Sequence, residues 1–335
     1  MQKYTQESIA TVHKPVLLQE CIELVTSNLP QNATIVDCTL GLAGHASAFL
    51  QAAPTATLIG IDRDPQALEL ATERVANLGL SERFIPVHAA FDELSSILDD
   101  RNISKVHAVF MDLGLSSLQI DEADRGFSYA HNTALDMRMD TTQSLTAQEI
   151  LDTYSEQDLV RIFRTYGEER FSKPIAKAII KRRGENPVRT SYELTHLVDG
   201  IIPRAHRSTG NPAKRVFQAL RIEVNGELDK LARTLPQAAL HLAVGGRLVV
   251  ESYHSLEDKA VKSFMNTGLT IEVPANMPVI PQDAQPFYRN ITRGAIKADE
   301  QEIANNKRSA SVRLRAVELI RDIPKRWQES YKKSA

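Results

Sequence analysis

The chain has 335 residues, of which 42% are hydrophobic and 24% charged, and its formal net charge is −2. This composition is ordinary for a globular protein with a hydrophobic core, and the length favours two domains. The sequence shows no run of roughly 20 apolar residues that would cross a bilayer, no secretory signal and no metal-ligand spacing of its two cysteines, so we expect a cytoplasmic protein without disulfides or a metal site.

The first third of the chain alternates short apolar runs with helical patterns. Strands are predicted at Ala33–Cys38, Ala56–Ile61, Phe84–Val87 and Val106–Leu113, and helices at Ala46–Gln51 and Pro65–Asn77. Such alternation is typical of right-handed βαβ units, so we predict a parallel sheet of the Rossmann-like α/β class.

The alternation stops after the fourth strand. The sequence then predicts only loops and helices, at Ala147–Asp152, Glu156–Tyr166, Pro174–Arg183, Tyr192–Ile201 and Lys214–Asn225. A helix at Glu227–Leu242 and a strand at Gly246–Ser252 resume the first pattern. We predict a discontinuous sheet domain, residues 1–115 and 226–335, interrupted by an all-helical substrate-recognition domain of residues 116–225.

The predicted helical domain is strongly basic. From Arg161 to Arg221 there are 14 basic and 5 acidic residues, a net charge of +9, and the chain from Lys307 onward is also basic. Clustered cations of this kind bind phosphates in nucleic-acid-binding proteins. A solvated helical face has the same composition, so charge alone leaves both interpretations open.

Polar and small residues follow the ends of the predicted strands, where ligands of open parallel sheets bind. Asp37 ends the first strand and precedes the turn Gly41–His45, whose small residues let a ligand approach the backbone. Asp62 follows the second strand, where a carboxylate accepts hydrogen bonds from the ribose hydroxyls of an adenosine. Phe91, after the third strand, is placed to cover an adenine, and Asp112 ends the fourth.

Two ligand classes fit this arrangement, dinucleotides and S-adenosylmethionine. A dinucleotide site needs Gly-x-Gly-x-x-Gly, whose backbone N–H groups hold the pyrophosphate. The turn here has glycine only at Gly41 and Gly44 and lacks the third glycine in that register. S-adenosylmethionine has no phosphate, and carboxylates such as Asp37 and Asp112 stabilise its cationic sulfonium. The residues favour the methyl donor and leave a nicotinamide-dependent oxidoreductase as the alternative.

Several longer segments are far more specific than a glycine-bearing turn. They are His13–Leu18 (HKPVLL), Met111–Ser117 (MDLGLSS) with Gln119, Asp124–Tyr129 (DRGFSY), Leu135–Asp140 (LDMRMD), Tyr166–Phe171 (YGEERF), Phe217–Ile222 (FQALRI) with Val224 and Asn225, and Tyr253–Asp258 (YHSLED). In this order they resemble the bacterial ribosomal small-subunit RNA (cytosine-N4)-methyltransferase family, from about His13 to Glu318.

The resemblance implies an S-adenosylmethionine-dependent enzyme that methylates N4 of a cytidine in the decoding region of 16S ribosomal RNA. It also implies action on the assembled small subunit and a Rossmann-like methyltransferase domain with an inserted helical domain. The family's cofactor contacts fall here on Ala43, Gly44, His45, Asp62, Phe91, Asp112 and Gln119. A homodimer is left open, as is a non-catalytic RNA-binding protein that retains the fold.

The chain departs from the family's pattern at three places. Cys38 replaces a usual glycine, Ala43 stands in a usual Gly-Gly-His, and Asn306–Ser309 replaces a typical Asn-Pro-Arg. Ala43 adds a methyl group to a turn that favours glycine if its φ is positive, which would weaken cofactor binding. No functional group is lost, so the prediction stands.

Methylation of a pyrimidine carbon uses a cysteine nucleophile, whereas methylation of an exocyclic amine needs no covalent intermediate. Cys21 and Cys38 fall in the first helix and the first strand, where a cysteine is usually a small buried hydrophobic residue. The candidate catalytic residues are Asp112, Ser116 and His254, with Asp112 or a neighbouring carbonyl accepting an N4 proton. For His254 a structural hydrogen bond is an equal alternative.

A cytosine in structured RNA must be flipped out to reach such a pocket. Phe127, Tyr129 and Tyr253 are candidates for stacking on it, although such residues more often lie in a core. We predict that RNA phosphates are bound by Arg138, Arg170, Arg215 and Arg221.

Overall fold

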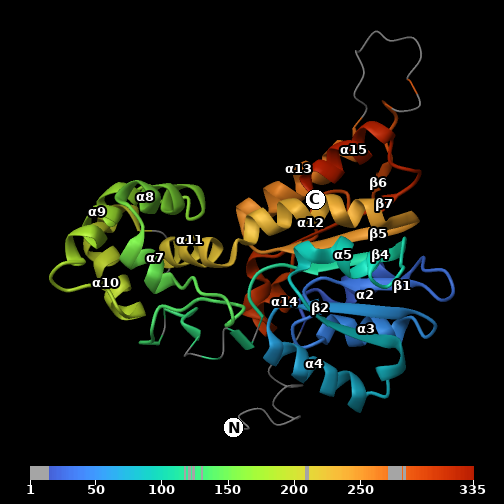
Figure 1. The fold of residues 1–335 in the computed structure, drawn as a ribbon, viewed down its shortest axis with the longest axis horizontal. Helices are drawn as coiled ribbons and strands as arrows, with labels where there is room; N and C mark the ends of the chain where they lie inside the picture. Colours follow the sequence, from blue (N-terminus) through green and yellow to red (C-terminus); the bar gives the residue numbers. More distant parts are fainter. Residues whose placement is uncertain are drawn as a thin grey trace. The chain divides into compact units, whose positions relative to one another are not determined.

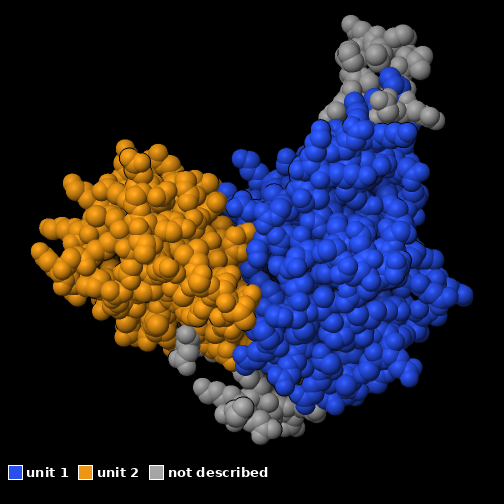
Figure 2. Space-filling model, in the orientation of Figure 1, with its two compact units in different colours: residues 1–114, 228–335 blue, residues 115–227 orange. Residues whose placement is uncertain are grey.

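The computed structural model describes residues 15–335 except 117, 120, 121, 123, 124, 130, 208–210, 271–280, 282 and 283. His13, Lys14, Ser117 and Asp124, which belong to the quoted motifs, lie outside the described residues. The chain forms two compact units (Figures 1 and 2): residues 1–114 with 228–335, here the sheet unit, and residues 115–227, here the helical unit. The sequence predicts 116–225 for the second.

Within the described part of the sheet unit, seven strands form one sheet in the order β3-β2-β1-β4-β5-β7-β6. They are β1 (Thr34–Asp37), β2 (Thr57–Asp62), β3 (Phe84–His88), β4 (Val106–Asp112), β5 (Leu242–Ser252), β6 (Tyr288–Asn290) and β7 (Arg313–Leu319). As predicted, β1 to β5 are parallel. The chain order reverses between β1 and β4, where ligands of doubly wound sheets bind beyond the carboxyl ends of the strands.

Helices cover both faces of this sheet (Figure 1). One face carries α2 (Leu18–Thr26), α3 (Gly44–Ala52) and α4 (Pro65–Asn77), and the other carries α5 (Leu94–Asp99), α12 (Glu227–His241), α13 (Ser255–Leu269) and α15 (Lys325–Ser334). A further short helix is α14 (Glu300–Asn305). Strand residues alternate between the two cores, as Ile35 joins the first and Val36 the second. Both faces are therefore buried, as in other parallel sheets.

The end of the sheet departs from the prediction. β7 is antiparallel to its neighbours β5 and β6, and the sequence predicts neither β6 nor β7. Along β7, Arg313 and Arg315 alternate with buried residues such as Leu314. These two arginines belong to the basic segment of the sequence from Lys307 onward. Arg315 Nε donates to Asp258 Oδ1 at 2.7 Å, and Arg313 lies 3.7 Å from the same carboxylate. These two cations form internal ion pairs.

The helical unit has its own hydrophobic core. Its helices are α7 (Ala147–Thr153), α8 (Glu156–Thr165), α9 (Ser172–Arg182), α10 (Ser191–Ile201) and α11 (Lys214–Asn225). The hydroxyl groups of Thr146, Ser155 and Thr190 accept hydrogen bonds from backbone N–H groups in the first turns of α7, α8 and α10. These N-caps fix where the three helices begin. No helix within the described ranges of the chain is long and apolar enough to cross a membrane.

Candidate functional site

The end of β1 is tied to the end of β4. Asp37 is 1% exposed, and its Oδ1 accepts a hydrogen bond from Thr39 N at 3.0 Å. Thr39 Oγ1 in turn accepts a hydrogen bond from the backbone N of Asp112 at 2.6 Å. Burial raises the pKa of Asp37 to about 7. Asp37 is therefore a buried residue that, through Thr39, helps to hold the ends of β1 and β4 together.

The predicted turn joins β1 to α3, and its backbone is unusual at Ala43. This residue has φ 55°, in the left-handed region that costs a residue with a side chain roughly 1–2 kcal/mol. Its methyl group is fully buried, so it packs into the core and leaves the ligand edge unobstructed. At the next position, a Cβ on Gly44 would lie 2.7 Å from Pro15 Cγ, so glycine is required there.

Asp62 ends β2 and is held in one orientation by two backbone N–H groups. Its Oδ2 accepts a hydrogen bond from Gly41 at 2.7 Å and its Oδ1 from Asp64 at 2.9 Å. Burial raises the pKa of Asp62 to about 6, so the group is mainly ionised at neutral pH. Each carboxylate oxygen retains a second lone pair, which can accept a ribose hydroxyl.

Asp112 ends β4 and, like Asp62, is partly exposed at this edge. Its side chain is 28% exposed, its Oδ1 accepts a hydrogen bond from Tyr253 Oη at 2.8 Å, and His45 Nδ1 lies 3.7 Å from its Oδ2. Burial raises the pKa of Asp112, while His45 and the Tyr253 hydroxyl act in the opposite direction. An oriented, accessible carboxylate with a raised pKa suits proton acceptance.

The side chain of His45 lies inside the sheet unit. The imidazole is buried, with its ring centre 4.8 Å from that of Phe110, and its Nε2 lies 3.0 Å from Val16 O. Burial lowers the pKa of His45. The side chain therefore acts on the edge of the sheet through Asp112.

The two other candidate catalytic residues form hydrogen bonds within their own segments. His254 caps α13, because its Nδ1 accepts a hydrogen bond from Glu257 N at 3.4 Å, while Glu257 Oε2 accepts those of Tyr253 N and His254 N. Ser116, in the helical unit, exchanges hydrogen bonds with Gln119: Ser116 N donates to Gln119 Oε1 at 3.1 Å, and Gln119 N donates to Ser116 Oγ at 3.3 Å. This pair caps a local turn.

The four aromatic residues singled out in the sequence lie in both units. Phe91 is half-buried in a short 3₁₀ helix, Phe91–Glu93, directly after β3. In the helical unit, Phe127 lies in the core and Tyr129 packs edge-to-face on Phe217, with ring centres 5.8 Å apart. The Tyr253 hydroxyl donates a hydrogen bond to Asp112, and its stacking on a base stays a prediction.

Two of the four predicted phosphate-binding arginines meet at a pocket of about 310 Å³ in the helical unit. Arg170 and Arg215 line it together with Arg207 and His206, and the His206 ring lies 5.7 Å from that of Phe171. Glu169, also in the lining, is buried, and its Oε1 accepts a hydrogen bond from Phe171 N at 2.8 Å. Cations and an aromatic face therefore share one concave surface.

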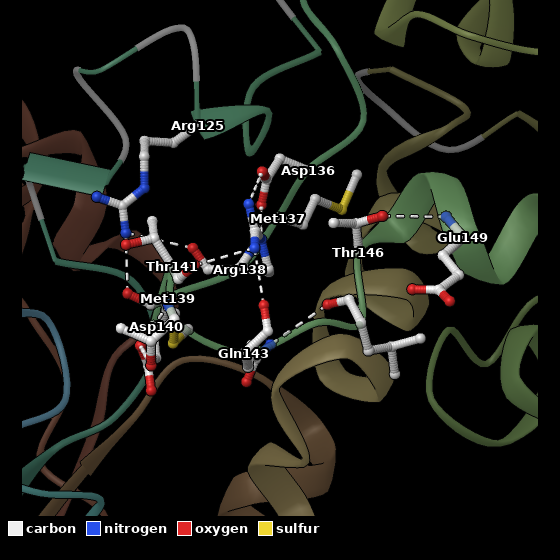
Figure 3. A network of polar contacts seen from close by, with 12 residues as sticks. Arg125, Asp136, Met137, Arg138, Met139, Asp140, Thr141, Gln143, Thr146 and Glu149 are labelled. Carbon is white, nitrogen blue, oxygen red and sulfur yellow. Dashed lines mark hydrogen bonds and ion pairs between the residues drawn. The ribbon is translucent and has the colours of Figure 1, made fainter.

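The other two arginines have internal partners. Figure 3 shows Arg138 between Asp136, whose two oxygens it binds at 2.8 Å each, and the carbonyls of Thr141 and Gln143 at 3.0 and 2.7 Å. Arg221 donates two hydrogen bonds of 2.9 Å to Glu227. These guanidinium groups form hydrogen bonds within the helical unit. Phosphate binding by all four arginines stays a prediction, for which the pocket that Arg170 and Arg215 line gives the most support.

The sequence is similar to known proteins along most of its length. The profile of the MraW methylase family matches residues 10–320. The Ribosomal RNA small subunit methyltransferase H of Bifidobacterium adolescentis is 66% identical over 328 residues, 98% of this chain and 96% of that protein. The proteins of the same name from Bifidobacterium animalis subsp. lactis and Beutenbergia cavernae are 67% and 51% identical, covering 96% and 95% of this chain and 91% and 95% of those proteins.

Proposed function

Because the chain belongs to the MraW methylase family and is an S-adenosylmethionine-dependent methyltransferase, we propose that it methylates N4 of a cytidine in 16S ribosomal RNA within the small ribosomal subunit. The observation that carries this proposal is the position of Asp112, an accessible carboxylate at the end of β4 that Tyr253 orients. The relatives' name supports ribosomal RNA as the substrate.

The edge of the sheet fits the cofactor. Asp62 has lone pairs for the ribose hydroxyls, and the half-buried Phe91 is suited to the adenine. Asp112, whose side chain is 28% exposed, is placed to face the sulfonium, and the buried Asp37 holds the end of β1 in position beneath it. When bound, the cofactor supplies the methyl group that the acceptor amine attacks.

Two observations favour an exocyclic amine over a ring carbon as the acceptor. The chain's two cysteines, Cys21 and Cys38, are 0% and 2% exposed, so neither can act as the nucleophile that carbon methylation uses. Asp112 can instead accept a hydrogen bond from the amine, hold its lone pair toward the methyl donor and take up the proton that the amine loses.

The helical unit is proposed to bind the RNA. Arg170 and Arg215 provide fixed positive charge at the pocket, and Phe171 provides a face on which a base can stack. Hydrogen bonds to phosphates position RNA without reading its sequence, so these residues would set affinity rather than the choice of cytidine. We also propose a cytoplasmic location, where small ribosomal subunits are found. A homodimer stays a prediction, which sedimentation velocity would test.

The proposal is tested by label transfer. Small subunits from cells that lack this enzyme are incubated with the purified protein and methyl-labelled S-adenosylmethionine, and the digested RNA is analysed by mass spectrometry. We expect labelled N4-methylcytidine in 16S RNA. Label on carbon 5 of the ring, on another RNA or on protein would overturn the assignment of the acceptor.

The role of Asp112 is tested separately with Asp112→Asn, which keeps the size of the side chain and removes its charge. Single-turnover methylation at saturating cofactor should fall about 100-fold or more, as expected for loss of a positioned base. Binding of S-adenosyl-homocysteine, measured by calorimetry, serves as the control for the cofactor site. If turnover is unchanged once the cofactor is saturating, Asp112 has no chemical role.

A further inference from the structure

Three different metal-ligating side chains meet inside the sheet unit. Cys21 comes from α2, His45 from α3 and Glu251 from β5, and their ligand atoms all lie within 4.8 Å of one another. They are 0%, 6% and 0% exposed. The transfer of a methyl group, as proposed above, uses neither Cys21 nor Glu251.

Glu251 is an unusual residue for this position. Its carboxylate is fully buried, and among the described residues no group other than the Cys21 thiol is within reach of a hydrogen bond to it. The nearest polar groups are the thiol of Cys21 and the imidazole of His45, whose Nε2 lies 3.7 Å from Glu251 Oε2, and the carboxylates of Asp112, Glu302 and Glu20 add further negative charge. An uncompensated buried carboxylate costs several kcal/mol, so the group requires a proton or a cation.

We propose that Cys21, His45 and Glu251 bind a divalent transition-metal ion, for which Zn²⁺ is the best match. Zinc accepts thiolate, imidazole and carboxylate ligands together, whereas Mg²⁺ and Ca²⁺ select oxygen. A thiolate and a carboxylate neutralise the two charges of the ion, which resolves the unpaired buried carboxylate. Nε2 of His45 and Oε2 of Glu251 lie 3.7 Å apart, a separation that two ligands at about 2.1 Å from a shared zinc ion have. The third ligand atom, Sγ of Cys21, lies within 4.8 Å of both.

The groups around the three ligands complete the site. Val16 O lies 3.0 Å from His45 Nε2, on the side where an ion would replace the proton of that nitrogen, and it is available as a fourth oxygen ligand. On the opposite side of the ring, Nδ1 faces the carboxylate of Asp112 at 3.7 Å. A carboxylate beside the second nitrogen of a histidine ligand is a recurrent feature of zinc sites, because it fixes the tautomer of the ring.

The first test is metal analysis of the intact protein, produced in zinc-supplemented medium and washed with a chelator before elemental mass spectrometry. We expect about one zinc ion per chain, retained because the site is buried. The matched control is Cys38→Ser, since Cys38 is also buried but packs in the core on the other face of the sheet. This variant should keep its metal, whereas Cys21→Ser and Glu251→Gln should lose it.

Cobalt provides a readout that depends on the ligands themselves. Wild-type protein refolded with Co²⁺ should show thiolate-to-cobalt absorption in the near ultraviolet, and this band should be absent from Cys21→Ser and present in Cys38→Ser. Circular dichroism identifies variants that fail to fold, and for these the wild-type metal content decides. Wild-type protein that contains neither zinc nor cobalt, or Cys21→Ser that retains the absorption, would overturn the proposal. Methylation of RNA is a separate readout and can persist in either case.

Discussion

The hydrogen bond from Tyr253 to Asp112 makes the sharpest prediction about the chemistry. Tyr253→Phe removes only the hydroxyl, which donates to Asp112 Oδ1 at 2.8 Å. Burial and the adjacent Asp112 raise the pKa of Tyr253 well above its ordinary value, so the phenol remains a donor throughout the working range of pH. The substitution therefore removes a hydrogen bond that stabilises the ionised form of Asp112.

The size of the effect follows from the kind of bond. Hydrogen bonds to charged groups contribute about 1.5–3 kcal/mol, which corresponds to roughly a 10- to 100-fold change in the protonation equilibrium. Burial already raises the pKa of Asp112, and loss of the hydroxyl raises it further. If ionised Asp112 accepts the proton, activity is present above its pKa and is lost as the pH falls through it. The acidic limb of the rate profile should therefore move to higher pH in Tyr253→Phe.

The assay is single-turnover methylation of small subunits at saturating cofactor, measured across a series of pH values. On the acidic limb, we expect Tyr253→Phe to be about 10- to 100-fold slower than the wild type, with a smaller difference at high pH. The control is Tyr288→Phe, because the Tyr288 hydroxyl is buried without a hydrogen-bond partner among the described residues. A Tyr253→Phe profile that superimposes on the wild-type profile would refute the role given to this pair.

Three further predictions concern the cofactor, the RNA and the fold. S-adenosyl-homocysteine should bind more weakly as the pH falls through about 6, where Asp62 takes up a proton, and calorimetry of Asp62→Asn should show weak binding with no such dependence. Charge reversal of Arg170 and Arg215 to Glu should weaken subunit binding and flatten its salt dependence, so an unchanged salt slope would count against the pocket. Gly126→Ala should lower the free energy of unfolding by more than Gly79→Ala does. Both glycines have positive φ, but only at Gly126 would a Cβ clash with backbone, namely with Ala134 O. Equal losses of stability in the two variants would contradict this.

Local patterns were sufficient to predict the parallel part of the sheet and several helices. α4 and α11 have the predicted bounds, because their apolar residues recur with helical spacing and, for α4, because Asp64 caps a helix that Pro65 begins. β6 and β7 were missed for a physical reason. β6 has only three residues, and both strands are defined by antiparallel pairing with each other and, for β7, with β5.

Contacts between distant parts of the chain account for most differences at the site. The positions of Asp62 and Asp112 at the ends of β2 and β4 were predicted from the apolar runs before them, and their role in binding the cofactor stays a prediction. The bond between Tyr253 and Asp112 joins residues 141 positions apart, and no local pattern indicates it. The ion pair of Arg138 could have been predicted, because Asp136 is only two residues away in the same motif. Glu251 stands out in the sequence as an acidic residue within the apolar run of β5. Its neighbours Cys21 and His45 come from α2 and α3, so the cluster could not be predicted from local pattern.

We propose that the carboxyl ends of β1, β2 and β4 bind the methyl donor, with hydrogen bonds and charge supplied by Asp62 and Asp112. A crystal structure of the protein with S-adenosyl-homocysteine tests it most directly. The claim predicts ribose hydroxyls within hydrogen-bonding distance of the Asp62 carboxylate and the ligand's sulfur beside Asp112. Ligand bound elsewhere, or a sheet edge closed by side chains under saturating ligand, would contradict it.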